Sequence, residues 1–314
     1  MSLAFTFPGQ GSQAMGMGAD LAEAFGPARE VFQEVDDALS QKLFLLMREG
    51  PPEDLTLTEN AQPALMAVSL AVVRVLQAEF GVDVSRAAFV AGHSLGEYSA
   101  LAAADSLPLG VTARLLKLRG QAMQRAVPVG EGAMASLIGP KADVALAEEA
   151  AKAGLAVGVC VVANDNNAGN VVISGDKAAV DKAIEAAKAL GARAILLNVS
   201  APFHCPLMQP AADEMAGALG LTEFVAPRAP LVPNVTARPT HDPETIRRLL
   251  VEQVTGRVRW RESIEWLVGE GGVTRFVELG AGKVLTGIAR RIAPDADALS
   301  IGAPADLEAF AKSL

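Results

Sequence analysis

Short strand-like runs alternate with longer helical runs along most of this chain, and this alternation is the feature that most constrains its fold. The clearest strand-like runs are LAFTF, AAFVAG, APLVPNV, TRFVEL and ALSI, at residues 3–7, 87–92, 229–235, 274–279 and 298–301. Amphipathic or apolar runs at residues 19–48, 62–80 and 243–254 predict helices between them. Because this pattern favours a parallel sheet with helices on both faces, we expect an α/β protein.

One segment departs from this pattern. From residue 129 to residue 198 the predicted order is strand, helix, two strands, helix, strand, which is the order of ferredoxin-like domains. Pro128 and Pro202 flank the segment. We therefore predict an inserted ferredoxin-like small domain of residues 129–198. Residues 1–128 and 199–314 would form the large domain around the parallel sheet.

Composition restricts the classes of function. The chain has 314 residues, of which 51% are hydrophobic and 4% aromatic, and this length suits one large or two modest domains. Its net charge of −9 argues against a general nucleic-acid binder. Cys160 and Cys205 are the only cysteines and lack metal-ligand spacing, so we expect no disulfide, no metal site and a reducing compartment.

We also expect a cytoplasmic protein that does not enter a membrane. The first ten residues, MSLAFTFPGQ, lack the basic region and the long apolar region of a signal peptide. The apolar run at residues 61–81 is interrupted by Arg74, Gln77 and Glu79, which indicates a buried helix of a globular protein.

Two glycine-rich runs resemble nucleotide-binding motifs only weakly. Residues 9–14 fit G-x-G-x-x-A, but that fingerprint expects a second strand ending in an acidic residue about 20 positions later. Residues 19–48 are predicted to be helical throughout, so a glycine-permitted turn explains this run without a ligand. In the second run Lys283 is followed by Val284 rather than Ser or Thr, which excludes a phosphate loop.

The run Gly92–Gly96, with the sequence GHSLG, is a stronger signal. An apolar strand precedes it and a helix follows it, as a G-x-S-x-G nucleophile elbow requires. The glycines allow a sharp turn that lifts Ser94 above the strand end, and the N–H of Leu95 would then point to a developing oxyanion. The alternative is that Ser94 only caps the helix.

A serine nucleophile needs a general base, and the chain has three histidines. His93 neighbours Ser94 on the elbow and is expected to point elsewhere. His241 precedes a helix start at Asp242 and is expected to be solvated. His204 follows a strand and lies in a loop, so elimination favours it as the base, although a structural histidine would also fit.

Two polar residues fall on apolar helical faces. Arg119 lies in the middle of the apolar arc of residues 111–126, which also contains Met123. A buried guanidinium needs an anion, either an internal carboxylate or a substrate carboxylate held bidentately. Gln253 lies on the apolar arc of residues 243–254, where it would orient an imidazole or satisfy core backbone groups.

Taken together, these residues resemble the malonyl-CoA:acyl carrier protein transacylases of fatty-acid synthesis. Seven stretches occur in that family's order: FTFPGQGSQAMGMG, TLTENAQPALMAVS, GHSLGEYSAL, KLRGQAMQ, VSAPFHCPLM, LVEQVTGRVRW and VELGAGKVLTG. The resemblance implies an α/β-hydrolase-like large domain that carries the ferredoxin-like small domain. It implies no cofactor, and its substrates are malonyl-CoA and phosphopantetheinylated acyl carrier protein.

The resemblance also assigns roles. Ser94 would be acylated, His204 would be its base, and the main-chain carbonyl of Gln253 would hold His204. The N–H groups of Gln10 and Leu95 would form the oxyanion hole.

Arg119 would grip the malonyl carboxylate. Met123 and Phe203 would line the substrate pocket, where Phe203 would disfavour an α-methyl group or would simply fill the core.

We expect a monomer that receives the acidic carrier protein on a basic surface. The candidate residues for that surface are Arg257, Arg259, Arg261, Lys283, Arg290 and Arg291. Two other functions share parts of this pattern, a serine esterase or thioesterase and a non-catalytic module that docks carrier proteins. The buried Arg119 argues against a simple hydrolase, which has no need for a guanidinium in its pocket.

Overall fold

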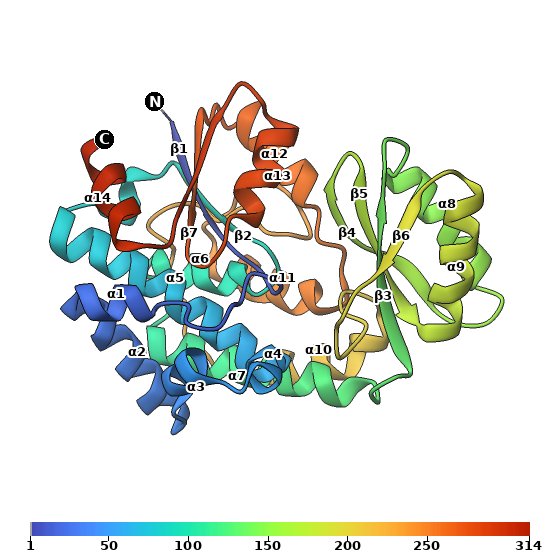
Figure 1. Cartoon of the computed structure of the whole chain (residues 1–314), viewed down its shortest axis with the longest axis horizontal. Coiled ribbons are helices and arrows are strands. Elements are labelled where there is room, and N and C mark those ends of the chain that lie inside the picture. Colours follow the sequence, from blue (N-terminus) through green and yellow to red (C-terminus); the bar gives the residue numbers. More distant parts are fainter. Residues whose placement is uncertain (1) are drawn as a thin grey trace.

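The computed structural model describes residues 2–314 and contains two separate sheets (Figure 1). The parallel sheet has the strand order β2-β1-β7-β8 and consists of β1 (Leu3–Phe7), β2 (Phe89–Gly92), β7 (Arg275–Leu279) and β8 (Asp297–Ile301). The antiparallel sheet has the order β4-β5-β3-β6 and consists of β3 (Gly132–Ile138), β4 (Cys160–Asn167), β5 (Asn170–Asp176) and β6 (Arg193–Leu196). The expected α/β class with a parallel sheet is confirmed.

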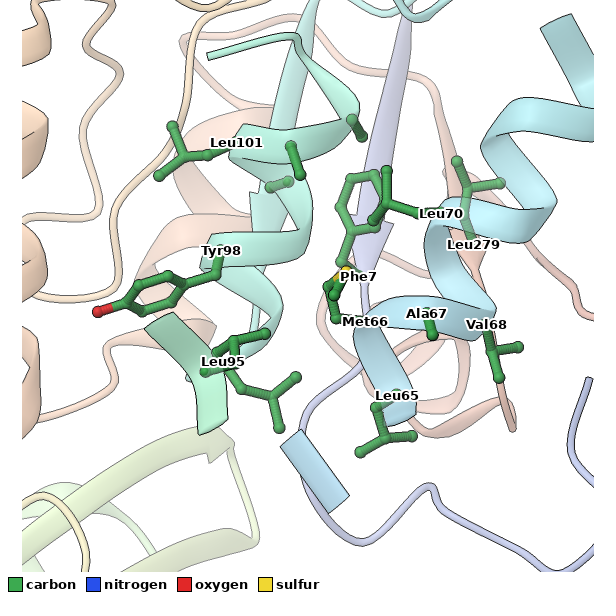
Figure 2. Close-up of a cluster of buried hydrophobic side chains, with 14 of the residues drawn as sticks. Phe7, Leu65, Met66, Ala67, Val68, Leu70, Leu95, Tyr98, Leu101 and Leu279 are labelled. Carbon is green, nitrogen blue, oxygen red and sulfur yellow. The ribbon is translucent and has the colours of Figure 1, made fainter. Parts of the chain in front are cut away.

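Both faces of the parallel sheet are buried, because alternate side chains of its strands enter different cores. Phe5 and Phe7 of β1 face a large core that includes α5 (Thr58–Phe80) and α6 (Gly96–Ala103). Figure 2 shows Phe7 directed toward Met66 and Leu70 of α5. On the opposite face, Ala4 packs in a second core with α12 (Trp260–Val268) and α13 (Val284–Ile292).

The two helices that lie between the strands of the antiparallel sheet both cover the same face of it. Ala135 and Leu137 of β3 face a core shared with α8 (Val144–Gly154) and α9 (Lys177–Ala189), which lie together on the outer side in Figure 1. Met134 of β3 and Val172 of β5 point the other way and join the large core. This sheet therefore turns its other face toward the parallel-sheet part of the molecule.

The remaining helices lie in the part of the molecule that contains the parallel sheet (Figure 1). They are α1 (Ala19–Ala24), α2 (Gly26–Leu39), α3 (Leu43–Glu49), α4 (Pro52–Thr56), α7 (Leu109–Ala126), α10 (Gln209–Gly220), α11 (Pro243–Thr255) and α14 (Pro304–Lys312), with short 3₁₀ turns η1 (Val84–Arg86) and η2 (Pro206–Met208).

Two predicted elements are wrong in detail. Residues 19–48 do not form one helix: Pro27 stands in the first turn of α2, and Ser40 ends α2 in a left-handed conformation with φ of 49°. Residues 229–235 do not form a strand, and Leu231 makes only isolated bridges, to Val90 and to Thr240. The prolines in this run lack backbone donors, so a regular ladder cannot continue through them.

Helix α5 is the one helix among residues 2–314 that is long and apolar enough to cross a membrane. Within its 23 residues, 67% of the most apolar window is buried inside the protein. Its burial against the parallel sheet is that of a core helix.

Candidate active site

Ser94 lies on a tight turn between β2 and α6. Its φ of 52° places it in the left-handed region, where a non-glycine residue costs about 1–3 kcal/mol unless the surroundings hold it there. The glycines on both sides are required by close backbone approach. A Cβ on Gly92 would lie 1.9 Å from the carbonyl oxygen of Gly96, and a Cβ on Gly96 would lie 2.2 Å from the carbonyl oxygen of Phe7. The strand, turn and helix expected for a nucleophile elbow are therefore present.

Ser94 and His204 are in direct contact. The distance from Ser94 Oγ to His204 Nε2 is 2.8 Å, and His204 Nδ1 lies 2.9 Å from the main-chain oxygen of Gln253 and 3.1 Å from that of Gly256. Because carbonyl oxygens only accept hydrogen bonds, Nδ1 carries the proton and Nε2 is free to accept the one on Ser94. Burial, followed by the charge of Arg119, lowers the pKa of His204 to about 3, so the imidazole is neutral near pH 7.

Arg119 of α7 is buried, with 1% of its surface exposed, as its place on the apolar arc predicts. Its Nη1 donates to Gln62 Oε1 over 2.8 Å, and its Nη2 donates to Gln253 Oε1 over 2.8 Å and to Ser94 Oγ over 3.1 Å. The guanidinium lies over the Tyr98 ring at 5.7 Å from its centroid. Its hydrogen-bond partners within residues 2–314 are thus neutral, which leaves its charge available to an anion beside Ser94.

Gln253 both contacts an imidazole and satisfies a backbone group of the core, the two roles between which its sequence position could not decide. Its main-chain oxygen holds the His204 imidazole. Its side-chain Nε2 donates to the main-chain oxygen of Ser94 over 3.0 Å and to Glu97 Oε2 over 2.9 Å, while its Oε1 accepts from Arg119. One buried residue thereby connects the imidazole, the guanidinium and the elbow.

A cavity of about 350 Å³ opens above Ser94, between the elbow and the face of the antiparallel sheet opposite α8 and α9. Met123 and Phe203 line it, as expected, together with Met134 and Val172 of that sheet. Gln10 and Leu95 also line it, and neither of their N–H groups has a hydrogen-bond partner in the described part of the chain. The cavity therefore presents two free amide donors, a hydroxyl, an imidazole and a guanidinium.

The other two histidines lie where the sequence places them. His93 Nε2 is 2.9 Å from Asn166 Oδ1, and its ring lies 5.6 Å from that of Trp260, so it does not face Ser94 although it borders the cavity. His241 is exposed, and Asp242 caps α11 by accepting from the Thr245 N–H. Within residues 2–314 no group of three His, Cys, Asp or Glu side chains is placed to hold a metal ion.

Several of the basic candidates for a docking surface have internal partners. Arg257 pairs with Glu148, and Arg261 pairs with Asp165 and Glu265. Arg259 pairs with Glu262, and Arg290 donates to the carbonyl oxygen of Ala298. Lys283 and Arg291 are exposed.

Sequence reasoning missed three buried polar residues of the site, Gln62, Glu97 and Asn234. Glu97 Oε2 accepts from Gln253 Nε2 and from the main-chain N–H of Asn234, each over 2.9 Å. Burial raises the pKa of Glu97 to about 7, against the opposing effect of these two hydrogen bonds and of Arg119. Glu97 follows Ser94 by three residues on an apolar helix, and a carboxyl in such a helix could have indicated a buried polar residue of the site. Asn234 lies in a loop, where no periodic pattern indicates burial.

Comparison with known proteins agrees with this geometry. The acyl transferase domain family matches residues 4–300. The malonyl CoA-acyl carrier protein transacylase of Escherichia coli K12 is 44% identical over 308 residues, which cover 98% of this chain and 97% of that protein. An acyl-carrier-protein-S-malonyltransferase from Bartonella henselae superposes with a TM-score of 0.96 at 56% identity, covering 100% of this chain and 99% of that one.

A further solved structure holds a malonyl-transacylase in complex with a type II PKS acyl-carrier protein. It matches with a TM-score of 0.96 at 42% identity and covers 100% of both chains.

Proposed function

The chain belongs to the acyl transferase domain family, and from that premise we propose that it transfers a malonyl group from malonyl-CoA to the phosphopantetheine thiol of acyl carrier protein, supplying extender units for fatty-acid synthesis. The observation that carries the proposal is the meeting of Ser94, His204 and Arg119 at one end of a cavity. A nucleophile with a base explains acyl transfer, and a buried cation beside the nucleophile explains why the acyl group ends in a carboxylate.

The first half-reaction acylates Ser94. His204 Nε2 takes the hydroxyl proton as Ser94 Oγ attacks the thioester carbon of malonyl-CoA, and general-base help of this kind contributes about 10²–10⁴-fold. The N–H groups of Gln10 and Leu95 hold the oxyanion, and one such donor contributes about 10²–10³-fold. As the intermediate collapses, His204 returns the proton to the departing CoA thiolate. A malonyl ester on Ser94 remains.

The second half-reaction is the reverse chemistry with another thiol. The phosphopantetheine thiol of acyl carrier protein enters the cavity and gives its proton to His204. Its sulfur attacks the ester carbon, and Ser94 Oγ leaves and recovers the proton. The two substrates use one site in turn, which makes the mechanism ping-pong, and the reaction needs no group beyond this chain and its two substrates.

Arg119 recognises the malonyl carboxylate. Its present partners are the side-chain amides of Gln62 and Gln253, so an incoming carboxylate adds the missing counter-charge. This charge also affects the base, because Arg119 contributes to the low pKa of His204. A bound malonyl carboxylate neutralises Arg119 and makes His204 a stronger base at the moment when the substrate is in place.

A simple esterase and a non-catalytic docking module explain less. An esterase has no use for a buried guanidinium whose hydrogen-bond partners, Gln62, Gln253 and Ser94, include no carboxylate. A docking module has no use for a serine held in a left-handed turn against an imidazole. The acyl transferase accounts for both features.

We also propose a domain division, a cellular location and a partner for the chain. The parallel-sheet part, residues 1–128 and 199–314, is an α/β-hydrolase-like domain, supported by the nucleophile elbow at the end of β2. Residues 129–198 are a ferredoxin-like small domain, supported by the βαββαβ order and the antiparallel strand order β4-β5-β3-β6. The protein is a cytoplasmic monomer whose partner is acyl carrier protein.

The direct test is intact mass spectrometry after incubation with malonyl-CoA. The wild type should gain one malonyl group, Ser94→Ala should gain none, and addition of phosphopantetheinylated acyl carrier protein should remove the group from the wild type. A wild type that stays unmodified would favour a docking module. Label that persists on Ser94→Ala would place the nucleophile elsewhere.

A further inference from the structure

Resting on the proposed function, we propose that Asn234 is a positioning residue for the Ser94 nucleophile: its buried side-chain amide clamps the backbone that leads into Ser94, at the Gly92 carbonyl and at the Ser94 N–H, and Glu97 holds Asn234 in place. Asn234 is fully buried and lies in the loop that follows the Leu231 bridge to β2. It touches none of the groups assigned to proton transfer or to carboxylate binding.

The clamp consists of two short hydrogen bonds of opposite sense. The Ser94 N–H donates to Asn234 Oδ1 over 2.7 Å, and Asn234 Nδ2 donates to the main-chain oxygen of Gly92 over 2.7 Å. An N–H can only donate and a carbonyl can only accept, so these partners fix which end of the amide faces which. Asparagine meets both demands, whereas aspartate would turn an oxygen toward the Gly92 carbonyl.

The amide continues a strand pairing that the backbone leaves incomplete. The loop bonds to β2 through two rungs, Val90 N–H to the Pro230 oxygen and Val232 N–H to the Val90 oxygen, each over 2.9 Å. At Asn234 the backbone N–H turns instead to Glu97 Oε2 over 2.9 Å. The Asn234 side chain donates to the Gly92 oxygen in place of that N–H, and it also accepts from the Ser94 N–H.

Glu97 joins this clamp to a second one. Its Oε2 accepts from the Asn234 N–H and from Gln253 Nε2, and the same Gln253 amide donates to the Ser94 carbonyl oxygen. Both backbone polar groups of Ser94 are therefore held by side-chain amides, those of Asn234 and Gln253, and both of these residues also donate to one oxygen of Glu97, Asn234 through its backbone N–H. This arrangement keeps Ser94 at φ of 52° and keeps its Oγ within 2.8 Å of His204.

The proposal predicts a loss of rate without a loss of recognition. Displacement of a reacting atom by about 1 Å can lower a rate about 100-fold, so Asn234→Ala should lower the maximal rate of Ser94 malonylation by about 10- to 100-fold in single-turnover mass measurements. The affinity for malonyl-CoA, measured by calorimetry with Ser94→Ala in the background, should not change. The preference for malonyl over acetyl groups should not change either, because Arg119 does not contact Asn234.

A matched control separates positioning from general damage. Asn60 is also buried, and its side chain bonds to Gln41, Lys117 and the Asp54 carbonyl, away from the elbow. Asn60→Ala should lower the unfolding temperature and leave the malonylation rate of the folded protein intact. If Asn234→Ala does not fold, Asn234→Asp replaces it; this variant keeps the size and the Ser94 acceptor but loses the donor to Gly92, and it should also be slow.

Two results would overturn the proposal: an unchanged malonylation rate in folded Asn234 variants, or a fall in affinity and acyl preference that parallels the fall in rate. If the wild type itself takes up no malonyl group, the proposed function fails separately. Positioning is then decided with phenylmethylsulfonyl fluoride, a reagent for activated serines, which should label Ser94 more slowly in Asn234→Ala than in the wild type.

Discussion

Arg119 donates a hydrogen bond from Nη2 to the Oγ of Ser94 over 3.1 Å, so the cation touches the proposed nucleophile itself. The two residues come from α7 and from the turn after β2, 25 positions apart in the chain. An acyl group attached to Oγ therefore forms directly beside a guanidinium whose other partners are neutral amides. Because of this contact, the preference of the protein for acyl groups that end in a carboxylate can be tested by substituting Arg119.

Arg119→Ala should remove most of the preference for malonyl over acetyl groups. A hydrogen bond to a charged group contributes about 1.5–3 kcal/mol, which corresponds to about 10–150-fold. The ratio of the acylation rates with malonyl-CoA and acetyl-CoA measures it. Arg125→Ala is the control, because Arg125 lies on the same helix but pairs with Glu214 at the surface and should leave the ratio unchanged. An unaltered ratio in Arg119→Ala would refute the role of this residue.

His204→Ala should slow the acylation of Ser94 by about 10²–10⁴-fold, since it removes the proposed general base. His241→Ala removes an exposed imidazole and should react at the wild-type rate. Stopped-flow measurement of CoA release compares the two variants. Equal rates for both would show that His204 is only structural.

Glu97→Gln should change how stability depends on pH. The pKa of Glu97 rises from 4.5 to about 7 on folding, so between these values the folded chain holds a proton that the unfolded chain has lost, and stability falls as pH rises. His204 acts in the opposite sense between pH 6.5 and about 3, because its pKa falls on folding and the unfolded chain holds the extra proton.

Removing Glu97 leaves the His204 contribution unopposed. The free energy of unfolding of Glu97→Gln should therefore rise more steeply than that of the wild type between about pH 5 and 6.5, by up to about 1.4 kcal/mol per pH unit. Urea denaturation across this range measures both slopes. The glutamine can keep both hydrogen bonds to its oxygen, because Glu97 Oε1 has no partner within residues 2–314. Identical slopes would contradict the raised pKa of Glu97.

Gly92→Ala should destabilise the elbow. The added methyl would lie 1.9 Å from the carbonyl oxygen of Gly96, and overpacking of this kind costs about 1–3 kcal/mol or more. Gly217→Ala is the matched control: Gly217 lies within α10 with nothing within 4 Å of the added carbon, so the change should stabilise by about 0.5–1 kcal/mol. Urea denaturation should show shifts of opposite sign, and a stable, active Gly92→Ala would disprove the tight turn.

Phe203→Leu should increase acylation by methylmalonyl-CoA relative to malonyl-CoA. Phe203 is buried and borders the cavity, and the exclusion of one methyl group contributes about 1–3 kcal/mol. Intact mass spectra with the two substrates in competition give the ratio. If the ratio stays the same while the unfolding temperature falls, Phe203 serves to fill the core.

Patterns within short stretches of the sequence predicted the features that depend only on neighbouring residues. The period of apolar residues predicted the parallel sheet, the inserted βαββαβ segment and the buried face of α7 with Arg119 on it, because burial must follow the period of a strand or a helix. The GHSLG run predicted the elbow, because only glycine permits such backbone contacts. The errors arose where prolines and a left-handed serine interrupt a run, at residues 19–48 and 229–235.

The sequence by itself thus determined which residues are buried or stand at a turn, and hence the serine, the histidine candidate and the inward cation. Only the tertiary structure decided what those side chains meet. The amides of Gln62, Gln253 and Asn234 and the carboxylate of Glu97 come from four separate segments, and their hydrogen bonds depend on distances between segments. Periodicity along one segment carries no information about such distances, which is why the clamp on Ser94 and the neutral hydrogen-bond partners of Arg119 appear only in the folded chain.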